Sequence, residues 1–417
     1  MRFGTDILRQ ADILAAFTED PPGVTRSYLT PQHRRAGDFI AALMREAGMD
    51  ASYDALGNVV GRYAADRPGA PVVMTGSHMD SVRNAGRYDG VFGILTAIAC
   101  VRDLHRRGRR LPFDLEVVAF GDEEGVRFGV TLIGSKAMGG SFDSAWLDAK
   151  DAAGTTLRDA LVAFGGDPDR WRALDRRGKG VVAYVESHIE QGPVLLDEGL
   201  PVGVVTAIAS GARMRVEVTG LAGHAGTVPM GSRQDALAAA AEMVLAVERI
   251  ASAPGEGGAA LVGTVGTIDA RPGAINVIPQ RVSFTVDVRS GDDVARRRAT
   301  EAMRDAFEAI ARRRRVKVAS EVFYELPAAP CDASLQDALA ASVARQGLPV
   351  RRLPSGAGHD AMVFPPVCPI AMLFVRCGAG GISHHPDETM TAEDAEVATS
   401  VFLDFLETWT PPNADDA

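Results

Sequence analysis

The sequence has few cysteines, and no two of them lie close together. The four thiols are Cys100, Cys331, Cys368 and Cys377, and none belongs to a CxxC motif. This spacing argues against a thiolate zinc site or an iron–sulfur cluster, and it is not the pattern of a disulfide-stabilised secreted domain. We therefore expect reduced thiols in a cytoplasmic protein.

Long apolar runs and an excess of positive charge are also absent. No segment reaches the roughly 18 apolar residues that a membrane-spanning helix needs. The formal net charge of −10 argues against nucleic acid or an anionic membrane as the main partner. What is present is a chain of 417 residues with 46% hydrophobic residues, enough for a sizeable core and, by its length, for two domains.

Strand-like and helical patterns alternate in the first and last parts of the chain. Helical spacing occurs at 30–48, 90–108 and 334–347, and apolar strand-like runs occur at 70–78, 113–124 and 369–376. Strands that alternate with helices indicate an α/β fold with a mostly parallel sheet and helices on its faces. In such folds, ligands bind at the carboxyl ends of the strands.

The middle of the chain has a different order of elements. Strand patterns lie at 213–220, 260–270, 281–289 and 316–324, and long helical patterns lie at 232–252 and 292–313. This βαββαβ order is that of a ferredoxin-like α+β unit, which is complete in itself. We therefore predict a catalytic α/β domain formed by 1–210 and 330–417, with a separate domain, 211–329, inserted into it.

Residues that bind metal ions recur at the predicted turns and strand ends. They are His78, Asp80, Asp89, Glu123, Glu124, His188, His359, His384 and His385. Each alone has an ordinary explanation, since aspartate is common in turns. Together, imidazole and carboxylate groups suit Zn²⁺, Mn²⁺, Co²⁺ or Ni²⁺ without choosing among them.

Nine short stretches carry a family resemblance over nearly the whole chain. They read GSHMDSV, GRYDGVFG, GDEEGVRF, ESHIEQGP, GHAGTVPM, INVIP, DVR, GAGHDAM and GISHHPDE, in this order. The chain resembles the amidase/hydantoinase/carbamoylase branch of the dinuclear zinc exopeptidases and aminoacylases. Within that branch it is most similar to the allantoate-hydrolysing members. The resemblance implies a zinc-exopeptidase-like catalytic domain with an inserted lid and dimerisation domain.

The resemblance implies a ligand set for two divalent ions, zinc or manganese, with cobalt or nickel as alternatives. His78 and His188 would bind one ion, Glu124 and His384 the other, and Asp89 would bridge them. Two ions about 3.5–4 Å apart can share a water and lower its pKa. Asp80 matches the carboxylate that orients the imidazole of His78.

Glu123 matches the general base of the family, which takes a proton from the bridging water and passes it to the leaving nitrogen. Adjacent residues at a strand end are expected to face different directions. We therefore expect Glu123 and Glu124 not to face the same metal ion.

In the inserted domain, the resemblance implies three residues that bind substrate. Arg289 would bind the substrate carboxylate with its two parallel N–H groups. His224 and Asn276 would stabilise the developing oxyanion. The resemblance also implies a homodimer formed through this domain, in which these groups reach the neighbour's site.

Five further positions add to the resemblance or depart from it. The backbone at Gly358 would line the substrate pocket. Gln191 and His359 are further candidates, and support of a loop is an equal alternative for His359. His385 stands where relatives commonly have Asn, which makes it a rival of His384. The chain also lacks the Gln that many relatives carry near Gly211, which bears on the choice of substrate.

The resemblance implies an amidohydrolase that cleaves a ureido C–N bond next to a carboxylate. Allantoate is the first expected substrate, with ureidoglycine or ureidoglycolate, ammonia and CO₂ as products. An N-carbamoyl-L-amino acid or β-ureidopropionate is the alternative. A catalytically inactive binding homologue is an alternative of another class, but it would be expected to have lost Glu123 or a ligand, and none is lost here.

Overall fold

The computed structural model describes residues 3–253 and 261–411, which divide into two compact units. The first unit comprises the described residues up to Thr206, together with Cys331–Leu353 and the residues from His359 onward. The second comprises Ala207–Pro330, apart from 254–260, and Pro354–Gly358. The last segment belongs with the second unit because the Ala209 amide donates to the Ser355 carbonyl and Arg289 Nη1 donates to the Gly356 carbonyl.

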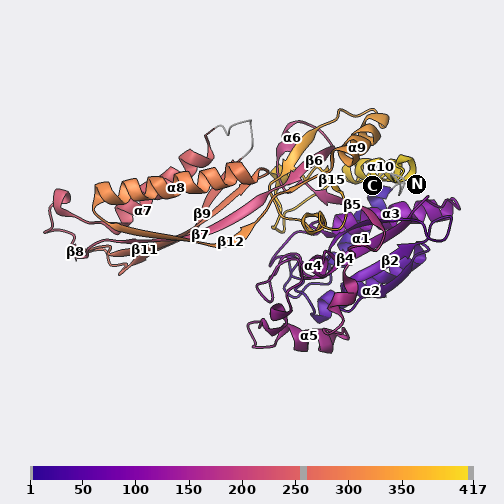
Figure 1. The fold of residues 1–417 in the computed structure, drawn as a ribbon, viewed down its shortest axis with the longest axis horizontal. Coiled ribbons are helices and arrows are strands. Elements are labelled where there is room, and N and C mark those ends of the chain that lie inside the picture. Colours follow the sequence, from indigo (N-terminus) through magenta and orange to yellow (C-terminus); the bar gives the residue numbers. More distant parts are fainter. Residues whose placement is uncertain (1–2, 254–260, 412–417) are drawn as a thin grey trace. The chain divides into compact units, whose positions relative to one another are not determined.

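The first unit is built on a mixed sheet with the strand order β1-β2-β4-β3-β5-β15-β6, and β14 pairs with β6. The strands are β1 (Asp50–Tyr53), β2 (Val59–Tyr63), β3 (Val72–His78), β4 (Asp114–Phe120), β5 (Val181–Ile189), β6 (Val202–Ile208), β14 (Arg352–Ser355) and β15 (Ile370–Val375). The four neighbouring strands β4, β3, β5 and β15 run parallel, whereas β1, β2 and β6 join antiparallel. Their shared direction brings four carboxyl ends to one edge of the sheet (Figure 1).

Helices bury the apolar strands of this sheet. The largest core cluster combines the strands with α1 (Phe3–Ala15), α2 (Pro31–Glu46), α3 (Val91–Arg106), α9 (Ala333–Arg345) and α10 (Ala392–Thr408). Helix α3 is buried over most of its length, which agrees with its almost uninterrupted apolar sequence. Side chains cap three of these helices at Thr30, Asp332 and Thr391. A smaller apolar cluster contains α4 (Ile133–Met138) and α5 (Leu157–Phe164).

The second unit has the predicted βαββαβ order. Its elements are β7 (Ser210–Thr219), α7 (Ala236–Ala251), β9 (Leu261–Arg271), β11 (Arg281–Ser290), α8 (Asp293–Arg314) and β12 (Lys317–Leu326). Residue 260, where the expected strand begins, lies outside the described residues. The strands form an antiparallel sheet in the order β12-β7-β11-β9, which is ferredoxin-like. The predicted fold class, an α/β domain with an inserted ferredoxin-like unit, is confirmed.

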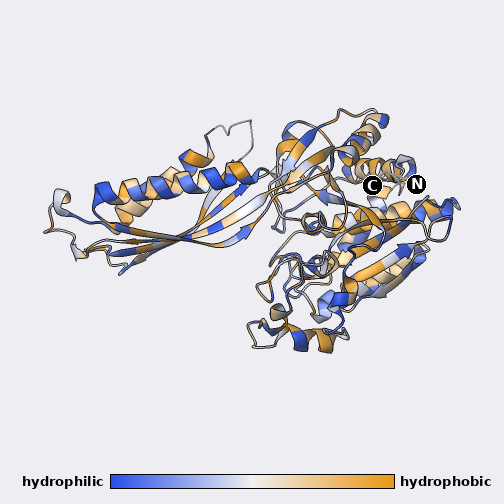
Figure 2. Ribbon diagram, viewed as in Figure 1, coloured by the Kyte–Doolittle hydropathy of each residue, from blue (hydrophilic) through white to orange (hydrophobic). Residues whose placement is uncertain are grey.

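The two helices of the second unit pack on one face of its sheet. Alternate residues of β11 are buried, and Phe284 meets Phe307 of α8 edge to face with ring centroids 5.8 Å apart. Asp235 and Asp292 cap the two helices by accepting from backbone N–H groups. Helix α8 combines many charged residues with a mostly apolar buried face, as an amphipathic helix requires, whereas α7 is apolar over most of its length (Figure 2).

The second unit also contains a short two-stranded ribbon. It pairs β8 (Gly223–His224) with β10 (Val277–Ile278), so that His224 lies opposite Val277. The Ala225 amide donates to the Asn276 carbonyl at 3.0 Å. Two sequence motifs that are about fifty residues apart are therefore neighbours.

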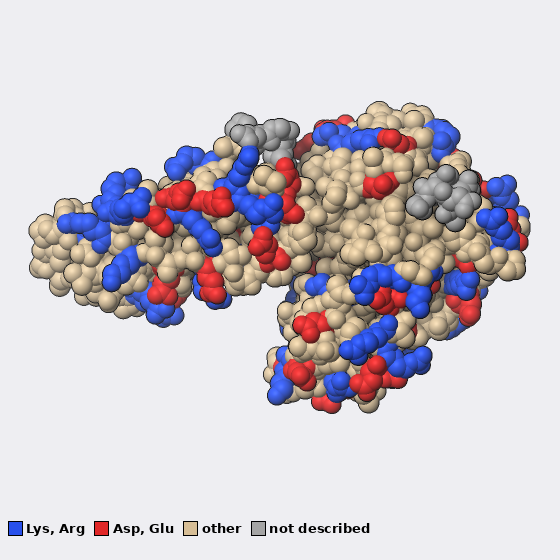
Figure 3. Space-filling model, viewed as in Figure 1, with Lys and Arg blue, Asp and Glu red and all other residues tan. Residues whose placement is uncertain are grey.

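The surface charges of both units are mixed in sign on the face that Figure 3 shows. Lys and Arg groups lie next to Asp and Glu groups, and many form ion pairs such as Arg213–Asp287 at 3.2 Å. No extended basic patch is seen on this face over the parts of the chain that the structure describes. Among the described residues, no helix has both the length and the apolar character to cross a bilayer.

The close approach of β3 and β4 at Gly76 gives a stability prediction. A Cβ at Gly76 would lie 2.0 Å from the Val118 carbonyl oxygen, whereas a Cβ at Gly211 in β7 would have nothing within 4 Å. Gly76→Ala should therefore lower the free energy of unfolding by about 1–3 kcal/mol or more. Gly211→Ala, the control, should stay within about 0.5 kcal/mol. Thermal unfolding followed by circular dichroism measures both, and equal transitions for the two variants would contradict the packing described.

Candidate metal centre

The candidate site lies at the carboxyl ends of the four parallel strands. His78 is the last residue of β3, and His188 is next to last in β5. Glu123 and Glu124 follow the end of β4 at Phe120, and His384 follows β15. This is the edge at which α/β folds bind their ligands.

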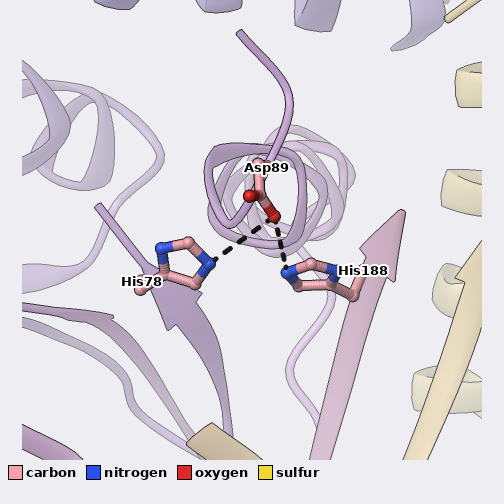
Figure 4. A group of neighbouring side chains, drawn as sticks. All are labelled: His78, Asp89 and His188. Carbon is pink, nitrogen blue, oxygen red and sulfur yellow. Dashed lines mark ion pairs between the residues drawn. The ribbon is translucent and has the colours of Figure 1, made fainter. Parts of the chain in front are cut away.

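Asp89 lies at the centre of the site, just before α3 (Figure 4). Its Oδ1 is 3.7 Å from His78 Nε2 and 3.4 Å from His188 Nε2. Its Oδ2 is 3.1 Å from His384 Nε2. One buried carboxylate thus faces two imidazoles with one oxygen and a third with the other.

Two groups of possible ligands share Asp89. His78, Asp89 and His188 form one, and Asp89, Glu124 and His384 form the other, with ligand atoms of each group within 4.8 Å of one another. Glu124 Oε1 lies 3.4 Å from His384 Nε2. Among the described residues, the buried His188 Nε2 and Asp89 Oδ2 make no hydrogen bond. Orphaned acceptors and a nitrogen–oxygen donor set fit two divalent ions of borderline hardness.

The two imidazoles of the first group are held by backbone carbonyls. His78 Nδ1 lies 3.1 Å from the Asp80 carbonyl oxygen, and His188 Nδ1 lies 2.8 Å from the Ile189 carbonyl oxygen. A proton on each Nδ1 would satisfy these contacts and leave each Nε2 lone pair directed at the centre.

The Asp80 carboxylate binds the backbone of the two glutamates rather than the His78 imidazole that it was expected to orient. Its Oδ1 lies 3.6 Å from His78 Nδ1, beyond hydrogen-bonding distance, so the backbone carbonyl makes the closer contact. The two carboxylate oxygens accept from the amides of Glu123 at 3.1 Å and Glu124 at 3.2 Å. Asp80 therefore fixes the turn that carries both glutamates.

The side chains of the two glutamates come together near His78, and their division between base and metal ligand stays a prediction. Glu123, Glu124 and His78 form a group whose ligand atoms lie within 4.8 Å of one another. The alternation of an extended strand does not apply, because β4 ends at Phe120 and the glutamates lie in a turn that closes at Gly125, where φ is +68°.

Gly90 lets the chain before α3 pass close to His78. Its φ is +67°, and a Cβ there would lie 2.3 Å from the His78 carbonyl oxygen and 2.6 Å from the His78 ring. Only glycine allows α3 to begin so close to β3, which brings Asp89 against His78.

Burial and like charges shift the acid–base behaviour of the metal-free site. Burial raises the pKa of Glu123 well above its ordinary value, and the Glu124 carboxylate raises it further. Burial, followed by the charge of Asp89, raises the pKa of Glu124 to about 7. Burial also raises the pKa of Asp89, but the nearby imidazoles of His384, His78 and His188 outweigh it and hold that pKa well below the usual range.

The structure separates the two adjacent histidines near the C-terminal helix. His384 has φ +56° and points Nε2 at Asp89 and Glu124. His385 is half-exposed, and its Nδ1 accepts from the Asp387 amide. His385 belongs to none of the ligand groups found among the described residues.

Gln191 and His359, the two weaker candidates, both touch this centre. Gln191 Nε2 donates to Asp89 Oδ1 at 3.0 Å and lies 3.3 Å from His384 Nε2. The buried His359 ring packs against His188 with centroids 4.5 Å apart.

Sequence reasoning missed several buried carboxylates of this region, among them Asp122 and Asp360, and two of those missed hold loops at the centre. Glu186 accepts from Ser77 Oγ at 2.8 Å, from the Ala361 amide at 3.0 Å and from Tyr184 Oη at 3.2 Å. Its place two residues before His188, on the same side of β5, was a signal that could have found it. Glu388, in the GISHHPDE stretch, is the other.

The predicted substrate residues lie in the second unit and are described within it. His224 Nδ1 accepts from the Gly226 amide at 3.0 Å, so Nε2 carries the proton of the neutral ring. Arg289 donates to both oxygens of Asp287, at 2.9 and 3.4 Å, and to the Gly356 carbonyl at 3.2 Å. Gly358 ends the same short segment as Gly356.

Comparison with known proteins identifies the family. The model of peptidase family M20/M25/M40 matches residues 74–408. An N-carbamoyl-L-amino acid amidohydrolase of Geobacillus stearothermophilus is 42% identical over 379 residues, 91% of each chain. Allantoate deiminase 1 of Glycine max is 39% identical, covering 92% of this chain and 84% of the relative. The structure of an amidase of the hydantoinase/carbamoylase family from Burkholderia multivorans matches with a TM-score of 0.90 and 34% identity over 97% of both chains. Asp89 is shared by two groups of possible metal ligands. The chain therefore belongs to peptidase family M20/M25/M40, in its hydantoinase/carbamoylase amidase branch, and is a metal-dependent amidohydrolase.

Proposed function

We propose that this enzyme hydrolyses the ureido C–N bond of a small substrate that carries a carboxylate, with allantoate as the first choice. The observation that supports hydrolysis at a dinuclear centre is Asp89, which faces both ligand groups with different oxygens. The products would be ureidoglycine or ureidoglycolate, ammonia and CO₂. An N-carbamoyl-L-amino acid is the second candidate, because the relative at 42% identity is named for that substrate.

Each ion has three ligands in this proposal. His78, His188 and Asp89 would bind one ion, and Asp89, Glu124 and His384 the other. Bound there as Zn²⁺ or Mn²⁺, two ions supply a water of lowered pKa and polarise the ureido carbonyl. The histidines serve as neutral ligands, and the carbonyls at Asp80 and Ile189 fix their orientation.

Glu123 is the general base of this proposal. Its carboxylate takes a proton from the attacking water and returns it to the leaving nitrogen. The raised pKa of the metal-free site favours the return of the proton, since a carboxylate of ordinary acidity returns a proton poorly at neutral pH. The charge of bound cations would favour the ionised form that accepts the proton. The amide of Glu123, held by Asp80, keeps the side chain at the site.

The second unit would bind the substrate. His224, with its Nδ1 occupied by the Gly226 amide, has a proton on Nε2 to donate to the developing oxyanion. Asn276, beside it on the ribbon, would donate to the same oxygen. Asp287 holds Arg289 in one orientation, which supports a role as a preorganised cation for the substrate carboxylate, beside the segment that ends at Gly358. The second unit would also form a homodimer.

The metal proposal predicts two divalent ions per chain. Exhaustive chelation should abolish ammonia release from the substrate, and Zn²⁺ or Mn²⁺ should restore it, because the proposed reaction needs the water that the bound ions supply. Elemental analysis of the purified protein and of the dialysed protein measures the content. Full activity in a chelated protein without metal would contradict the proposal.

The adjacent glutamates should differ when each is changed to the isosteric amide. Glu123→Gln should retain two ions and lose at least about 100-fold in kcat, because an amide cannot accept the proton. Glu124→Gln should instead bind one ion more weakly. Metal titration and steady-state kinetics separate the two effects. A Glu123→Gln enzyme with near-normal kcat would assign the base elsewhere.

The choice of substrate is tested with ammonia release from allantoate, N-carbamoyl-L-amino acids and β-ureidopropionate.

On the preferred substrate, Arg289→Lys should lower kcat/KM by about 10- to 100-fold, because lysine retains the charge but loses one charge-assisted hydrogen bond. Arg271→Lys is the matched control, since Arg271 also pairs with an aspartate two residues earlier in its strand, Asp269. Equal effects of the two substitutions would remove Arg289 from substrate binding.

Complementation between inactive subunits tests the proposed homodimer. If His224 acts at the partner's centre, mixing His224→Ala with Glu123→Gln chains should restore activity, because each heterodimer contains one intact composite site. Activity is measured after the heterodimer is isolated with two different affinity tags. An isolated heterodimer without activity would place His224 at its own chain's centre or outside catalysis.

A further inference from the structure

Glu388 is a buried carboxylate in the segment between β15 and α10, with a side chain only 2% exposed. Its Oε1 accepts from the amides of Tyr88 at 2.8 Å and Asp89 at 3.2 Å. Its Oε2 accepts from Ser383 Oγ at 2.8 Å. It therefore joins two segments that lie 300 residues apart in the sequence.

Each of these two segments carries a proposed ligand of the second ion. The first carries Asp89, whose own amide is one of the donors, and the second carries His384, which directly follows Ser383. The two ligand atoms, Asp89 Oδ2 and His384 Nε2, lie 3.1 Å apart. The carboxylate binds the backbone amide of Asp89 on one side and the hydroxyl of Ser383, the residue before His384, on the other.

The chain near Asp89 is built around this carboxylate. A Cβ at Gly86 would lie 2.3 Å from Glu388 Cβ and 2.4 Å from its carboxyl carbon, so only glycine leaves room for the side chain there. The amides of Tyr88 and Asp89 precede α3, where an anion is favoured by the helix dipole. On the other side, His384 has a left-handed backbone, φ +56°, which a non-glycine residue adopts only when its surroundings impose it.

We propose that Glu388 is a positioning residue that sets the separation of Asp89 and His384, and so determines the affinity of the second ion without contacting it. This inference rests on the proposed ligand roles. A carboxylate that only stabilised the fold would weaken both ions equally. Loss of a positioning carboxylate weakens the ion held by Asp89, Glu124 and His384 more than the ion held by His78, His188 and Asp89. Glu388 supports two ligands of the former, Asp89 and His384, but only Asp89 among the ligands of the latter.

The test is metal binding to the full chain in the absence of substrate, so that its outcome is independent of which ureido compound is hydrolysed. The metal-free protein is titrated with Zn²⁺ against a competing chelator, and thermal unfolding of the metal-free form is recorded. The variants are Glu388→Ala, Glu388→Gln and Ser383→Ala. His384→Ala marks the loss of the second ion, and Asp387→Asn, whose side chain is 80% exposed, is the neighbouring control.

Glu388→Ala should bind the second ion about 10- to 100-fold more weakly, as does loss of the groups that orient metal ligands elsewhere, while the first ion, which shares only Asp89, is weakened by a smaller factor. Glu388→Gln should recover most of this affinity, because its Oε1 still accepts from both amides and its NH₂ can donate to Ser383 Oγ. Ser383→Ala should weaken the second ion by a smaller factor, and Asp387→Asn should bind both ions as the parent does.

Unchanged affinity for the second ion in Glu388→Ala would overturn the proposal, as would equal weakening of both ions. If the alanine variant does not fold, Ser383→Ala and Glu388→Gln decide. An unaltered second ion in Ser383→Ala, or a glutamine variant as impaired as His384→Ala, would overturn it. Normal metal binding throughout without hydrolysis of any ureido compound would refute only the proposed function.

Discussion

The buried carboxylate of Asp89 is the interaction on which the rest of the site depends. A carboxylate that is removed from water needs compensating charge or hydrogen bonds. In this protein it is surrounded by three imidazoles, at 3.1, 3.4 and 3.7 Å, and by the carboxamide of Gln191. Such a position is reached only because four parallel strands end at one edge of the sheet and Gly90 lets α3 begin against β3.

Behind the proposed ligands, other carboxylates act on the backbone. Asp80 accepts from the amides of both glutamates, and Glu388 accepts from the amides of Tyr88 and Asp89. Glu186 accepts from the amide of Ala361, two residues after His359. Each of these carboxylates fixes the backbone of a loop, and that loop carries a side chain of the centre. Precise placement of metal ligands requires such support.

Much of the fold could be predicted from periodicity and capping. The Thr30 cap and the apolar spacing after it indicated α2, and the βαββαβ order of the insert was legible because each element is long and regular. Strand β5 and helix α10 were not predicted, although both contribute to the core. The close approach of Glu123 and Glu124 near His78 was not predicted, since a strand pattern does not show where the strand gives way to a turn.

The proposed ligands were named from motifs, and the structure brings them together, but their supports were not visible in the sequence. Glu388 and Tyr88 are 300 residues apart, so no local pattern connects them. The pairing of Arg289 with Asp287 was within reach, because alternate residues of a strand share a face. The separation of His384 from His385 depends on a left-handed backbone that two adjacent histidines do not reveal.

Anomalous diffraction from crystals of the zinc-loaded protein tests the central claim most directly. Two peaks should appear about 3.5–4 Å apart, with Asp89 between them, His78 and His188 beside one, and Glu124 and His384 beside the other. A single peak, or two peaks that do not share Asp89, would contradict the dinuclear centre.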